Sequence, residues 1–359
     1  MMTAIQKLQK EMSERGARAA LITSDVNRRF FTGMKSSAGT LLVFCDAAYL
    51  IIDFRYIEKA RSVVKDCEVI LQQGGGEIYR QIQQLCDEHN ADIICVEADR
   101  MTLAEADKLS EELDCSLDMS DLLCDVVTEI RMIKTPEQIE KMTAAQRIAE
   151  QGLEHMYEFI KPGVTEKEIQ LELDFYMLSH GAEALSFDTI ALSGVNTSMP
   201  HGVPSDKKVE SGEFVLMDFG AVVNGYHSDM TRTVCIGEPS DKMREVYDIV
   251  LEAQNRGLNA VKAGITGGEL DGIAREYIAG HGYGEAFGHS LGHGVGAEIH
   301  EAPYASPFSD TILRDGMVVT VEPGIYIPGE FGVRIEDFVV VRENGCLNMT
   351  QADKSLVIL

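Results

Sequence analysis

Two aspartates interrupt apolar, strand-like runs near the middle of this chain. They lie in the segment FVLMDFGAVVNGYHSDMTRTV (214–234), with Asp218 before and Asp229 after the pair Asn224-Gly225. Asn-Gly is the strongest short hairpin signal, because both residues tolerate positive φ. The segment therefore predicts two antiparallel strands that each carry a carboxylate.

The hairpin register predicts how close these carboxylates lie. If Asn-Gly forms the turn, Val223 pairs with Tyr226, and Asp218 falls opposite Thr231. Asp229 then shares the face of Asp218 as a diagonal neighbour, a relation that spans about 7–8 Å between backbones. Two carboxylates on an apolar strand pair repel each other and are costly to desolvate unless a cation lies between them. A solvent-exposed face is the alternative, and the apolar residues before Asp218 disfavour it.

A glycine-rich segment further along, FGHSLGHGVGAEIHEAP (287–303), concentrates histidine. It holds His289, His293 and His300, a third of the nine histidines in the chain. Glycines let the backbone approach closely, and the spacing matches no zinc-finger pattern. Three imidazoles in one such segment indicate a metal ligand with partners for proton transfer.

Two glutamates also interrupt runs that should be buried. Glu322 lies in VVTVEPGIY (318–326) and Glu336 in GVRIEDFVVV (332–341). A buried carboxylate needs a cation or a hydrogen-bonded partner. Arg334 could pair with one of these glutamates, which leaves a purely structural role open for that residue.

The five candidate ligands form an oxygen-rich set with one imidazole: Asp218, Asp229, His293, Glu322 and Glu336. Such a set suits Mn²⁺, Co²⁺, Fe²⁺ or Zn²⁺ rather than a thiolate-bound structural zinc. Four carboxylates carry four negative charges, which two divalent ions would balance. Two neighbouring metals can lower the pKa of a bridging water and polarise a carbonyl group.

The elements that must position these residues divide into two predicted domains. Residues 1–125 are predicted to form an α/β domain that shapes a site or an interface, because short branched-apolar runs alternate with helical patterns. Residues 126–359 are predicted to form the catalytic domain. The strand-like runs and the clearest helix of the first domain are Ala20–Thr23, Leu41–Phe44, Tyr49–Ile52, Val69–Leu71, Ile93–Val96 and Glu77–Glu88.

An internal repeat organises the second domain. A helix is predicted to begin after Thr135, which is followed by proline and, two residues later, glutamine in the style of a capping box. Downstream, KPGVTEKEIQLELDFYMLSHG (161–181) aligns without gaps onto KAGITGGELDGIAREYIAGHG (262–282). Caps, period and ending all coincide, which indicates a duplicated α/β half. Pseudo-twofold packing would place a site between the halves.

Composition narrows the class of protein. The chain has 359 residues, 32 basic against 58 acidic side chains and a net charge of −26, which disfavours nucleic acid and anionic membranes as partners. No run reaches the ~18 apolar residues of a membrane span. The eight cysteines form no C-x-x-C pair and mostly follow apolar residues, as in Leu42-Val43-Phe44-Cys45. Reduced, buried thiols in a cytoplasmic protein are therefore expected.

At these residues the sequence resembles the metal-dependent pita-bread peptidases of the Xaa-Pro branch, the prolidases (Xaa-Pro dipeptidases) and aminopeptidases P. The matching stretches are SFDTIALSGVNTSMPHG (186–202), MDFGAVVNGYHSDMTRTV (217–234), GHSLGHGVGAEIHEAP (288–303) and EPGIYIPGEFGVRIED (322–337). The resemblance covers about the last 225 residues, and 1–125 is compatible with the family's N-terminal creatinase/prolidase-type α/β domain. It implies an α/β (α+β) chain with a duplicated pita-bread catalytic domain. Ala297 stands where the family often has a larger aliphatic residue.

The resemblance also implies roles for individual residues. Asp218 would be the bidentate ligand of one of two divalent ions, with Mn²⁺ expected and Co²⁺, Zn²⁺ or Fe²⁺ as alternatives. Asp229 and Glu336 would bridge the ions, and His293 and Glu322 would ligate the second. The positions that match histidines and residues near the metal site are His201, His289, His300, Tyr326 and Arg334.

The implied reaction is hydrolysis of an Xaa-Pro bond by a metal-bridging hydroxide. Glu322 is the expected general base, and His300 would help to stabilise the oxyanion while His201 steadies the substrate. Small proline-containing peptides are the expected partners, and a homodimer is expected. A creatinase-like hydrolase or a binding module of the same fold is the alternative, but either should have lost these ligands.

The motifs leave open whether a dipeptidase or an aminopeptidase is encoded. A dipeptidase must hold a free C-terminal carboxylate with a cation, and the candidates for that cation are Lys207, Lys208 and Arg314.

Overall fold

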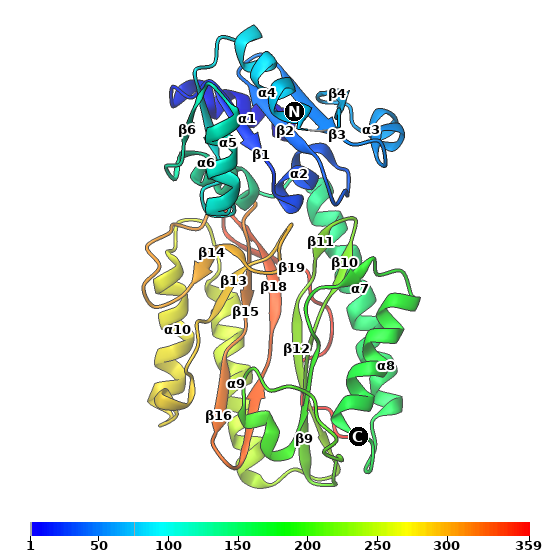
Figure 1. Cartoon of the computed structure of the whole chain (residues 1–359). Helices are drawn as coiled ribbons and strands as arrows, with labels where there is room; N and C mark the ends of the chain where they lie inside the picture. The colour runs from blue at the N-terminus through cyan, green and yellow to red at the C-terminus, as the bar shows by residue number, and fades with distance from the viewer. Residues whose placement is uncertain (1, 75) are drawn as a thin grey trace. The chain divides into compact units, whose positions relative to one another are not determined.

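The protein forms two compact units. The computed structural model describes residues 2–74 and 76–359, which separate by their internal contacts into units Met1–Arg131 and Met132–Leu359. Figure 1 shows both units along the chain, coloured from blue to red.

The first unit is built on a mixed six-stranded sheet in the order β4-β3-β2-β1-β5-β6. The antiparallel pairs β1–β2 and β2–β3 lie at its centre, with parallel pairs outside them. Alternate residues of the central strands enter two separate apolar clusters, so that both faces of the sheet are buried. Its strands are β1 (Ala19–Ile22), β2 (Thr40–Phe44), β3 (Ala48–Ile52), β4 (Glu68–Leu71), β5 (Ile93–Val96) and β6 (Ser116–Asp118).

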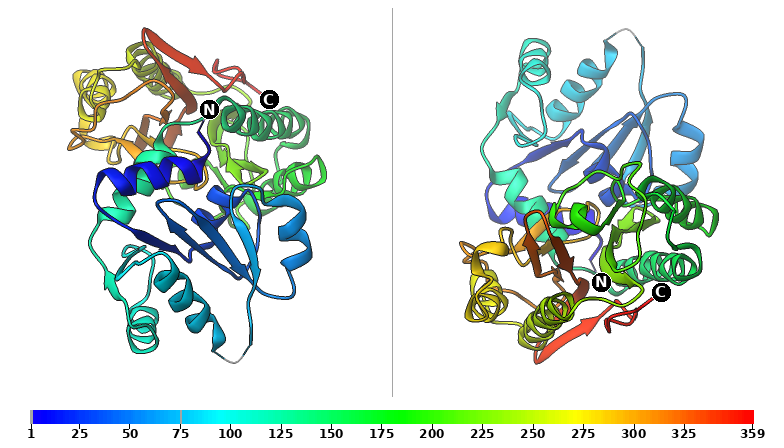
Figure 2. Two further views of the ribbon diagram at one scale, coloured as in Figure 1. Left: turned by 90° about the horizontal axis from the view of Figure 1, so that it is seen from above. Right: turned by 90° about the horizontal axis from the view of Figure 1, so that it is seen from below.

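Six helices cover the two faces of this sheet (Figure 2). Helices α1, α2, α3 and α6 contribute to one apolar cluster, and α4 and α5 to the other. Their bounds are α1 (Ala4–Glu14), α2 (Asp25–Thr32), α3 (Ile57–Val63), α4 (Glu77–Glu88), α5 (Leu103–Glu112) and α6 (Leu122–Met132). The predicted strands and the predicted helix Glu77–Glu88 are confirmed, with strand ends within one residue.

In the second unit, two pairs of long helices flank the strands (Figure 1). Helices α7 and α8 pack on one strand group, and α9 and α10 pack on the other. The bounds are α7 (Pro136–Phe159), α8 (Glu166–Ser179), α9 (Asp241–Ala260), α10 (Gly267–Gly280) and the 3-10 turns η1 (Gly194–Ser198) and η2 (Gly284–Ala286). The predicted helix start is confirmed: Thr135 forms a capping box with Gln138, and Pro136 is the first helical residue.

The strands of this unit form small sheets between the helix pairs, in the orders β12-β9-β8, β11-β10-β7, β15-β18-β19, β13-β14 and β16-β17. The first group is β7 (Ala184–Leu185), β8 (Ile190–Ser193), β9 (Glu213–Phe219), β10 (Ala221–Val223), β11 (Tyr226–His227) and β12 (Met230–Ile236). The second is β13 (Gly292–Gly294), β14 (Glu301–Ala305), β15 (Val318–Val321), β16 (Gly324–Ile327), β17 (Phe331–Arg334), β18 (Asp337–Arg342) and β19 (Gly345–Asn348).

The predicted hairpin register is confirmed. Val223 pairs with Tyr226, and Asp218 pairs with Thr231. The register stays constant although the hairpin passes from one sheet to another at Gly220. A Cβ atom at Gly220 would lie 2.0 Å from the carbonyl oxygen of Ser228, so this crossing requires glycine.

The sequence repeat is also a structural repeat. Thr165 and Thr266 cap α8 and α10 through capping boxes of the same kind. Ahead of each cap the backbone repeats its hydrogen bonds, from Gly163 N–H to Val209 O in the first half and from Gly264 N–H to Leu313 O in the second, each at 2.9 Å. The duplication predicted from residues 161–181 and 262–282 therefore extends to the segments that each helix start contacts.

The cysteines only partly follow the prediction. All eight are free thiols; four are buried, three are half-buried, and Cys45 is exposed. β2 ends at Phe44, so Cys45 falls in the turn after the buried strand and not in its core. Within the described part of the chain, no helix is long and apolar enough to cross a membrane.

Candidate metal and active site

The carboxylate and histidine residues predicted as ligands come together inside the second unit. Each stands in a strand or within two residues of a strand end: Asp218 in β9, Asp229 before β12, His293 in β13, Glu322 after β15 and Glu336 between β17 and β18. The first two belong to the first half of the repeat, and the other three belong to the second half.

His293 lies between carboxylates of both halves. Its Nε2 atom is 3.5 Å from Asp229 Oδ2 and 3.4 Å from Glu322 Oε1. Its Nδ1 atom lies 3.1 Å from the carbonyl oxygen of Gly294, which orients Nε2 toward the carboxylates. One potential ligand atom each of Asp229, His293 and Glu336 lies within 4.8 Å of the others. Across residues 2–74 and 76–359, no other group of three or more such side chains is as close together.

The site has unused acceptors. Asp229 is 3% and Glu336 1% exposed. Asp218 Oδ1 and Glu336 Oε1 are buried and have no hydrogen-bond partner among the described residues. Buried polar atoms are normally satisfied, and here the unsatisfied atoms are acceptors at the centre of a carboxylate cluster. Carboxylate oxygens with one imidazole nitrogen and no thiolate are ligand atoms that fit divalent cations.

The pKa values of three carboxyl groups show the cost of burying them together without a cation. Burial and the charge of Asp218, against the opposing charge of Arg334, raise the pKa of Glu322 from 4.5 to about 8. Burial also raises the pKa of Asp229 and Glu336 well above their usual range, and neighbouring carboxylates add to both shifts. Burial lowers the pKa of His293, which favours the neutral imidazole that a metal requires. A bound cation would reverse the carboxylate shifts.

Arg334 pairs with an aspartate and not with either glutamate. Its Nη2 lies 2.5 Å from Asp218 Oδ2, and Nε donates to Thr231 Oγ1 at 3.1 Å. Its Nη1 donates to the hydroxyl of Tyr326 at 2.8 Å. The suggested pairing of Arg334 with Glu322 or Glu336 is therefore wrong: the hairpin register brings Asp218 to the arginine at the end of β17.

Tyr326 extends this contact to His289. The tyrosine hydroxyl lies 2.9 Å from His289 Nε2, while His289 Nδ1 lies 2.8 Å from the carbonyl oxygen of Ser290. Burial lowers the pKa of His289 to about 4, and the charge of Arg334 adds to this effect. His289 is therefore neutral near pH 7 and joined through Tyr326 and Arg334 to Asp218.

The other two histidines border the cluster. The His300 ring lies edge-on to the His293 ring, with centroids 4.4 Å apart. Burial lowers the pKa of His300, and the charges of His293 and His201 contribute. His201 is exposed on the segment after η1. Its charge is one of the causes that lower the pKa of both His289 and His300. All ten predicted site residues therefore belong to one region of the second unit.

Two threonines at the site were missed by the sequence analysis. Thr231 Oγ1 donates to Glu336 Oε2 at 2.7 Å, and Thr320 Oγ1 donates to Glu322 Oε1 at 3.0 Å. Thr320 also accepts the His293 backbone N–H at 3.0 Å. The available signal was their spacing: Thr231 is two residues after Asp229, and Thr320 is two residues before Glu322, which places each pair on one strand face.

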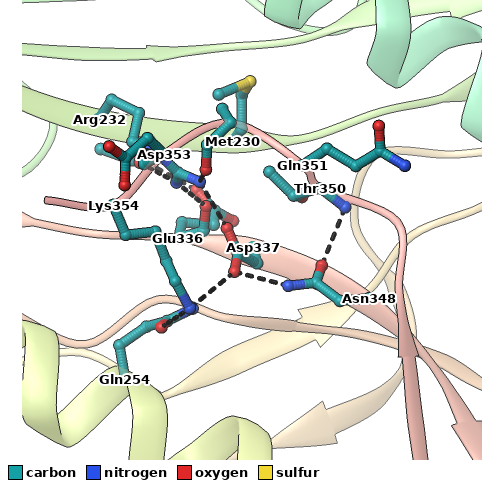
Figure 3. A network of polar contacts seen from close by, with 12 residues as sticks. Met230, Arg232, Gln254, Glu336, Asp337, Asn348, Thr350, Gln351, Asp353 and Lys354 are labelled. Atoms are coloured by element: carbon teal, nitrogen blue, oxygen red, sulfur yellow. Dashed lines mark hydrogen bonds and ion pairs between the residues drawn. The ribbon is translucent and has the colours of Figure 1, made fainter.

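A buried ionic network behind Glu336 was also missed (Figure 3). Arg232 donates to the carbonyl oxygen of Glu336 at 2.5 Å and pairs with Asp337 at 2.7 Å. Lys354 lies 3.2 Å from the other oxygen of Asp337, to which Asn348 donates at 2.8 Å. Arg232 and Asp337 follow site residues by one position, so they point to the opposite strand face and fix the backbone from behind.

Lys207, one of the cations considered for a substrate carboxylate, is bound elsewhere. Its ammonium group lies 2.7 Å from Glu213 Oε2 and 3.1 Å from Ser193 Oγ. The charge of Lys208 contributes to lowering the pKa of Glu168, at the start of α8. Neither lysine makes a described contact with the carboxylate cluster.

A duplicated α/β unit that encloses a carboxylate-rich cation site defines a metal-dependent enzyme. Residues 140–343 match metallopeptidase family M24, and residues 5–133 match the creatinase/prolidase N-terminal domain. The chain belongs to metallopeptidase family M24, which confirms the resemblance and the two-part fold. Divalent metal ions are the cofactors that this family implies.

Similar proteins match nearly the whole chain. An Xaa-Pro dipeptidase of Pyrococcus furiosus is 39% identical over 354 residues, covering 98% of this chain and 99% of that protein. The structure of an Xaa-Pro dipeptidase from Bacillus anthracis is similar with a TM-score of 0.95 and 44% identity, covering 99% of both chains. That of an X-Pro aminopeptidase from Thermotoga maritima has a TM-score of 0.91 and 40% identity, covering 97% of this chain and 99% of that one.

Proposed function

We propose that this metallopeptidase hydrolyses the Xaa-Pro bond of dipeptides or at the N-terminus of longer peptides, with two divalent ions at the cluster. The observation that carries the proposal is the set of four carboxylates near His293, two of them buried and two half-buried, in which two oxygens lack hydrogen-bond partners among the described residues. Xaa-Pro activity in the names of relatives at 39% and 44% identity supports the substrate class.

The ions would be held by Asp218, Asp229, His293, Glu322 and Glu336. When bound, they supply an activated water and polarise the scissile carbonyl group. Mn²⁺ is the proposed ion, with Co²⁺, Zn²⁺ and Fe²⁺ as alternatives, since an oxygen-rich ligand set with one imidazole suits all four.

The remaining steps are assigned to side chains of this chain. Glu322 would take the proton of the attacking water, since its Oε1 lies 3.4 Å from His293 Nε2 and burial raises its pKa to about 8, near the pH at which a general base works best. His300, kept neutral by burial, donates a hydrogen bond to the developing oxyanion. His201 steadies the substrate from the exposed rim. His289 faces the leaving-group side, held neutral and oriented by Tyr326.

Proline fits a site of this kind because its ring nitrogen carries no hydrogen once it is acylated. A site without a backbone acceptor at that position loses nothing when the N–H group is absent, whereas an ordinary peptide would leave its N–H unsatisfied. Homodimer formation and a cytoplasmic location remain part of the proposal, as does the division of the chain into domains 1–125 and 126–359.

The test is an assay of the protein after metal removal and reconstitution with Mn²⁺, Co²⁺, Zn²⁺ or Fe²⁺. Ala-Pro, Ala-Pro-Ala and a matched Ala-Ala-Ala control serve as substrates. Cleavage of Ala-Pro alone identifies a dipeptidase, and cleavage of Ala-Pro-Ala alone identifies an aminopeptidase. Equal cleavage of Ala-Ala-Ala, or full activity of Glu322→Gln without bound metal, would contradict the proposal.

A further inference from the structure

Glu166 is a fully buried carboxylate outside the metal cluster, and it accepts hydrogen bonds from three residues. It stands at the first position of α8 and is 0% exposed. Its Oε1 accepts from Ser193 N–H at 2.7 Å, from Ser193 Oγ at 3.1 Å and from Asn196 Nδ2 at 3.0 Å. Its Oε2 accepts from Ser205 N–H at 3.0 Å, from Ser205 Oγ at 2.6 Å and from Asn196 Nδ2 at 3.1 Å. Burial of a carboxylate is costly, and these donors offset that cost.

The donors mark the two ends of a single segment. Ser193 ends β8 and Ser205 lies twelve positions later, so one carboxylate ties together both ends of the segment that carries His201. Lys207, just beyond, accepts the Glu166 backbone N–H with its carbonyl oxygen at 3.0 Å. Side chain and main chain of Glu166 therefore close the segment into a loop.

The middle of this loop is fixed from the metal-site side. Thr197 is fully buried, and its Oγ1 accepts from Gly332 N–H of β17 at 2.8 Å. Arg334 Nη1 contacts the carbonyl oxygen of Pro200 at 3.4 Å, next to His201. His201 thus projects from a loop that Glu166 holds at both ends and that β17 holds at its centre.

The other half of the repeat shows that this carboxylate is not required by the fold. Gly267 occupies the position equivalent to Glu166, and its N–H makes the equivalent bond to Thr311 O at 3.0 Å. A Cβ atom at Gly267 would lie 2.1 Å from the carbonyl oxygen of Tyr304. In the second half, the backbone of Tyr304 therefore occupies the space that corresponds to the Glu166 side chain in the first half. The two halves thus close the corresponding segment by different means.

We propose that Glu166 is a positioning residue for His201, holding the loop so that this histidine meets the substrate in one orientation. The inference rests on the proposed function, in which His201 steadies the Xaa-Pro substrate. Glu166 lies outside the cluster, so its effect should fall on substrate use and not on metal binding.

Glu166→Gln tests the assignment. Glutamine keeps the size but has one acceptor oxygen, so its amide N–H groups oppose the donors of Ser193 or Ser205. We expect kcat/KM for an Xaa-Pro substrate to fall about 10- to 100-fold, as for small displacements of a positioned group. Metal affinity by calorimetry should stay within about 2-fold, since none of the hydrogen bonds to the Glu166 carboxylate involves a proposed metal ligand. The matched control is Glu168→Gln, two positions along α8, where glutamine can still complete the capping box.

A double-mutant cycle separates positioning from general damage. In the His201→Ala background, Glu166→Gln should lower kcat/KM by no more than about 2-fold, because its target is gone. A full multiplicative loss in the double variant would overturn the proposal, as would weakened metal binding or unchanged kcat/KM in folded Glu166→Gln.

If Glu166→Gln does not fold, Ser205→Ala provides the same test in milder form. It removes one of the six hydrogen bonds that Glu166 accepts, together with the bond from Lys207 N–H to Ser205 Oγ, and it leaves the carboxylate in place. It should give a smaller loss of kcat/KM that also vanishes in the His201→Ala background. Amide hydrogen exchange of residues 194–204 should accelerate in these variants and not in Glu168→Gln. Lack of Xaa-Pro cleavage by the unmodified protein would refute the proposed function, whereas unchanged exchange in this segment would refute the role of Glu166.

Discussion

Burial of Glu322 favours its protonated form, whereas its proposed role as ligand and base requires the ionised form. Burial raises its pKa from 4.5 to about 8, so without metal the proton stays on at neutral pH. The role of ligand and base requires the ionised form. Asp229 and Glu336 share this conflict. Binding of a divalent ion must therefore release protons.

The first prediction is that metal affinity rises with pH. For a carboxyl group with a raised pKa, the protonated form stabilises the metal-free fold. That contribution is complete below its ordinary value of 4.5 and is lost as pH rises through about 8. Mn²⁺ affinity should increase by up to about tenfold per pH unit for each proton released. Calorimetry between about pH 6 and pH 9 in buffers of different ionisation enthalpy measures both quantities. Affinity independent of pH would contradict the raised pKa values.

A second prediction concerns Tyr326, whose hydroxyl joins Arg334 to His289 at 2.8 and 2.9 Å. Tyr326→Phe leaves the buried Arg334 and the half-buried His289 without that partner, a loss of about 1–3 kcal/mol. We expect kcat/KM to fall about tenfold, with bound metal unchanged. Tyr247→Phe is the control, because its hydroxyl donates to the carbonyl oxygen of Lys354 and to none of the ten predicted site residues, and it should lower stability alone. Equal activity of the two variants would exclude a role for this contact.

Residue types were enough to single out side chains that the structure brings together, because carboxylates and clustered histidines are rare in apolar strands. The partners of these residues were harder to predict. Thr231 and Thr320 are common strand residues, and nothing in their own neighbourhood shows that a glutamate far along the chain accepts their hydroxyl hydrogens. The pairing of Arg334 with Asp218 likewise joins residues more than a hundred positions apart.

At the scale of elements, the hairpin β9–β12 carries two of the proposed ligands and depends on Gly220. The backbones of Gly220 and Ser228 approach so closely that a Cβ atom would lie 2.0 Å from the serine carbonyl oxygen. Asp218 precedes this contact by two residues, and Asp229 follows Ser228 directly. The separation of the two carboxylates is therefore set by a close approach of backbones.

The third prediction is that Gly220→Ala separates these strands. The clash should cost about 1–3 kcal/mol of unfolding free energy and also weaken metal binding. Gly272→Ala in α10 is the matched control, because no atom lies within 4 Å of its added Cβ. It should instead stabilise the protein by up to about 1 kcal/mol. Denaturant unfolding measures the unfolding free energy of both variants, and metal titration measures their metal affinity. Equal metal affinity would show that the hairpin tolerates the methyl group.

Elements with local signals were predicted from sequence, whereas elements with distant partners were not. The Asn-Gly turn and the Thr-Pro helix start act within a few residues, and both matched the structure. The Arg232–Asp337 pair and the loop held by Glu166 depend on contacts between separate elements. A charged residue in an apolar strand signals only that some partner exists.

For the whole molecule, the cation site belongs to only one of the two compact units. The fourth prediction is that chelation lowers the melting temperature of the C-terminal unit by about 5–10 °C, the stabilisation given by ions at about 100 times their Kd. Differential scanning calorimetry of the metal-free and Mn²⁺-loaded protein measures the shift. Identical curves would show that the carboxylates tolerate each other without a cation.

The matching hydrogen bonds at the starts of α8 and α10 indicate that the two halves descend from one shorter chain. The first half contributes Asp218 and Asp229, and the second contributes His293, Glu322 and Glu336, so neither half holds all of the proposed ligands. A half-length ancestor would have needed a second copy of itself to surround an ion. Fusion of two such copies would replace their association with a tether and raise their effective concentration. Joined halves are free to diverge, and Glu166 in one half stands where the other half has Gly267.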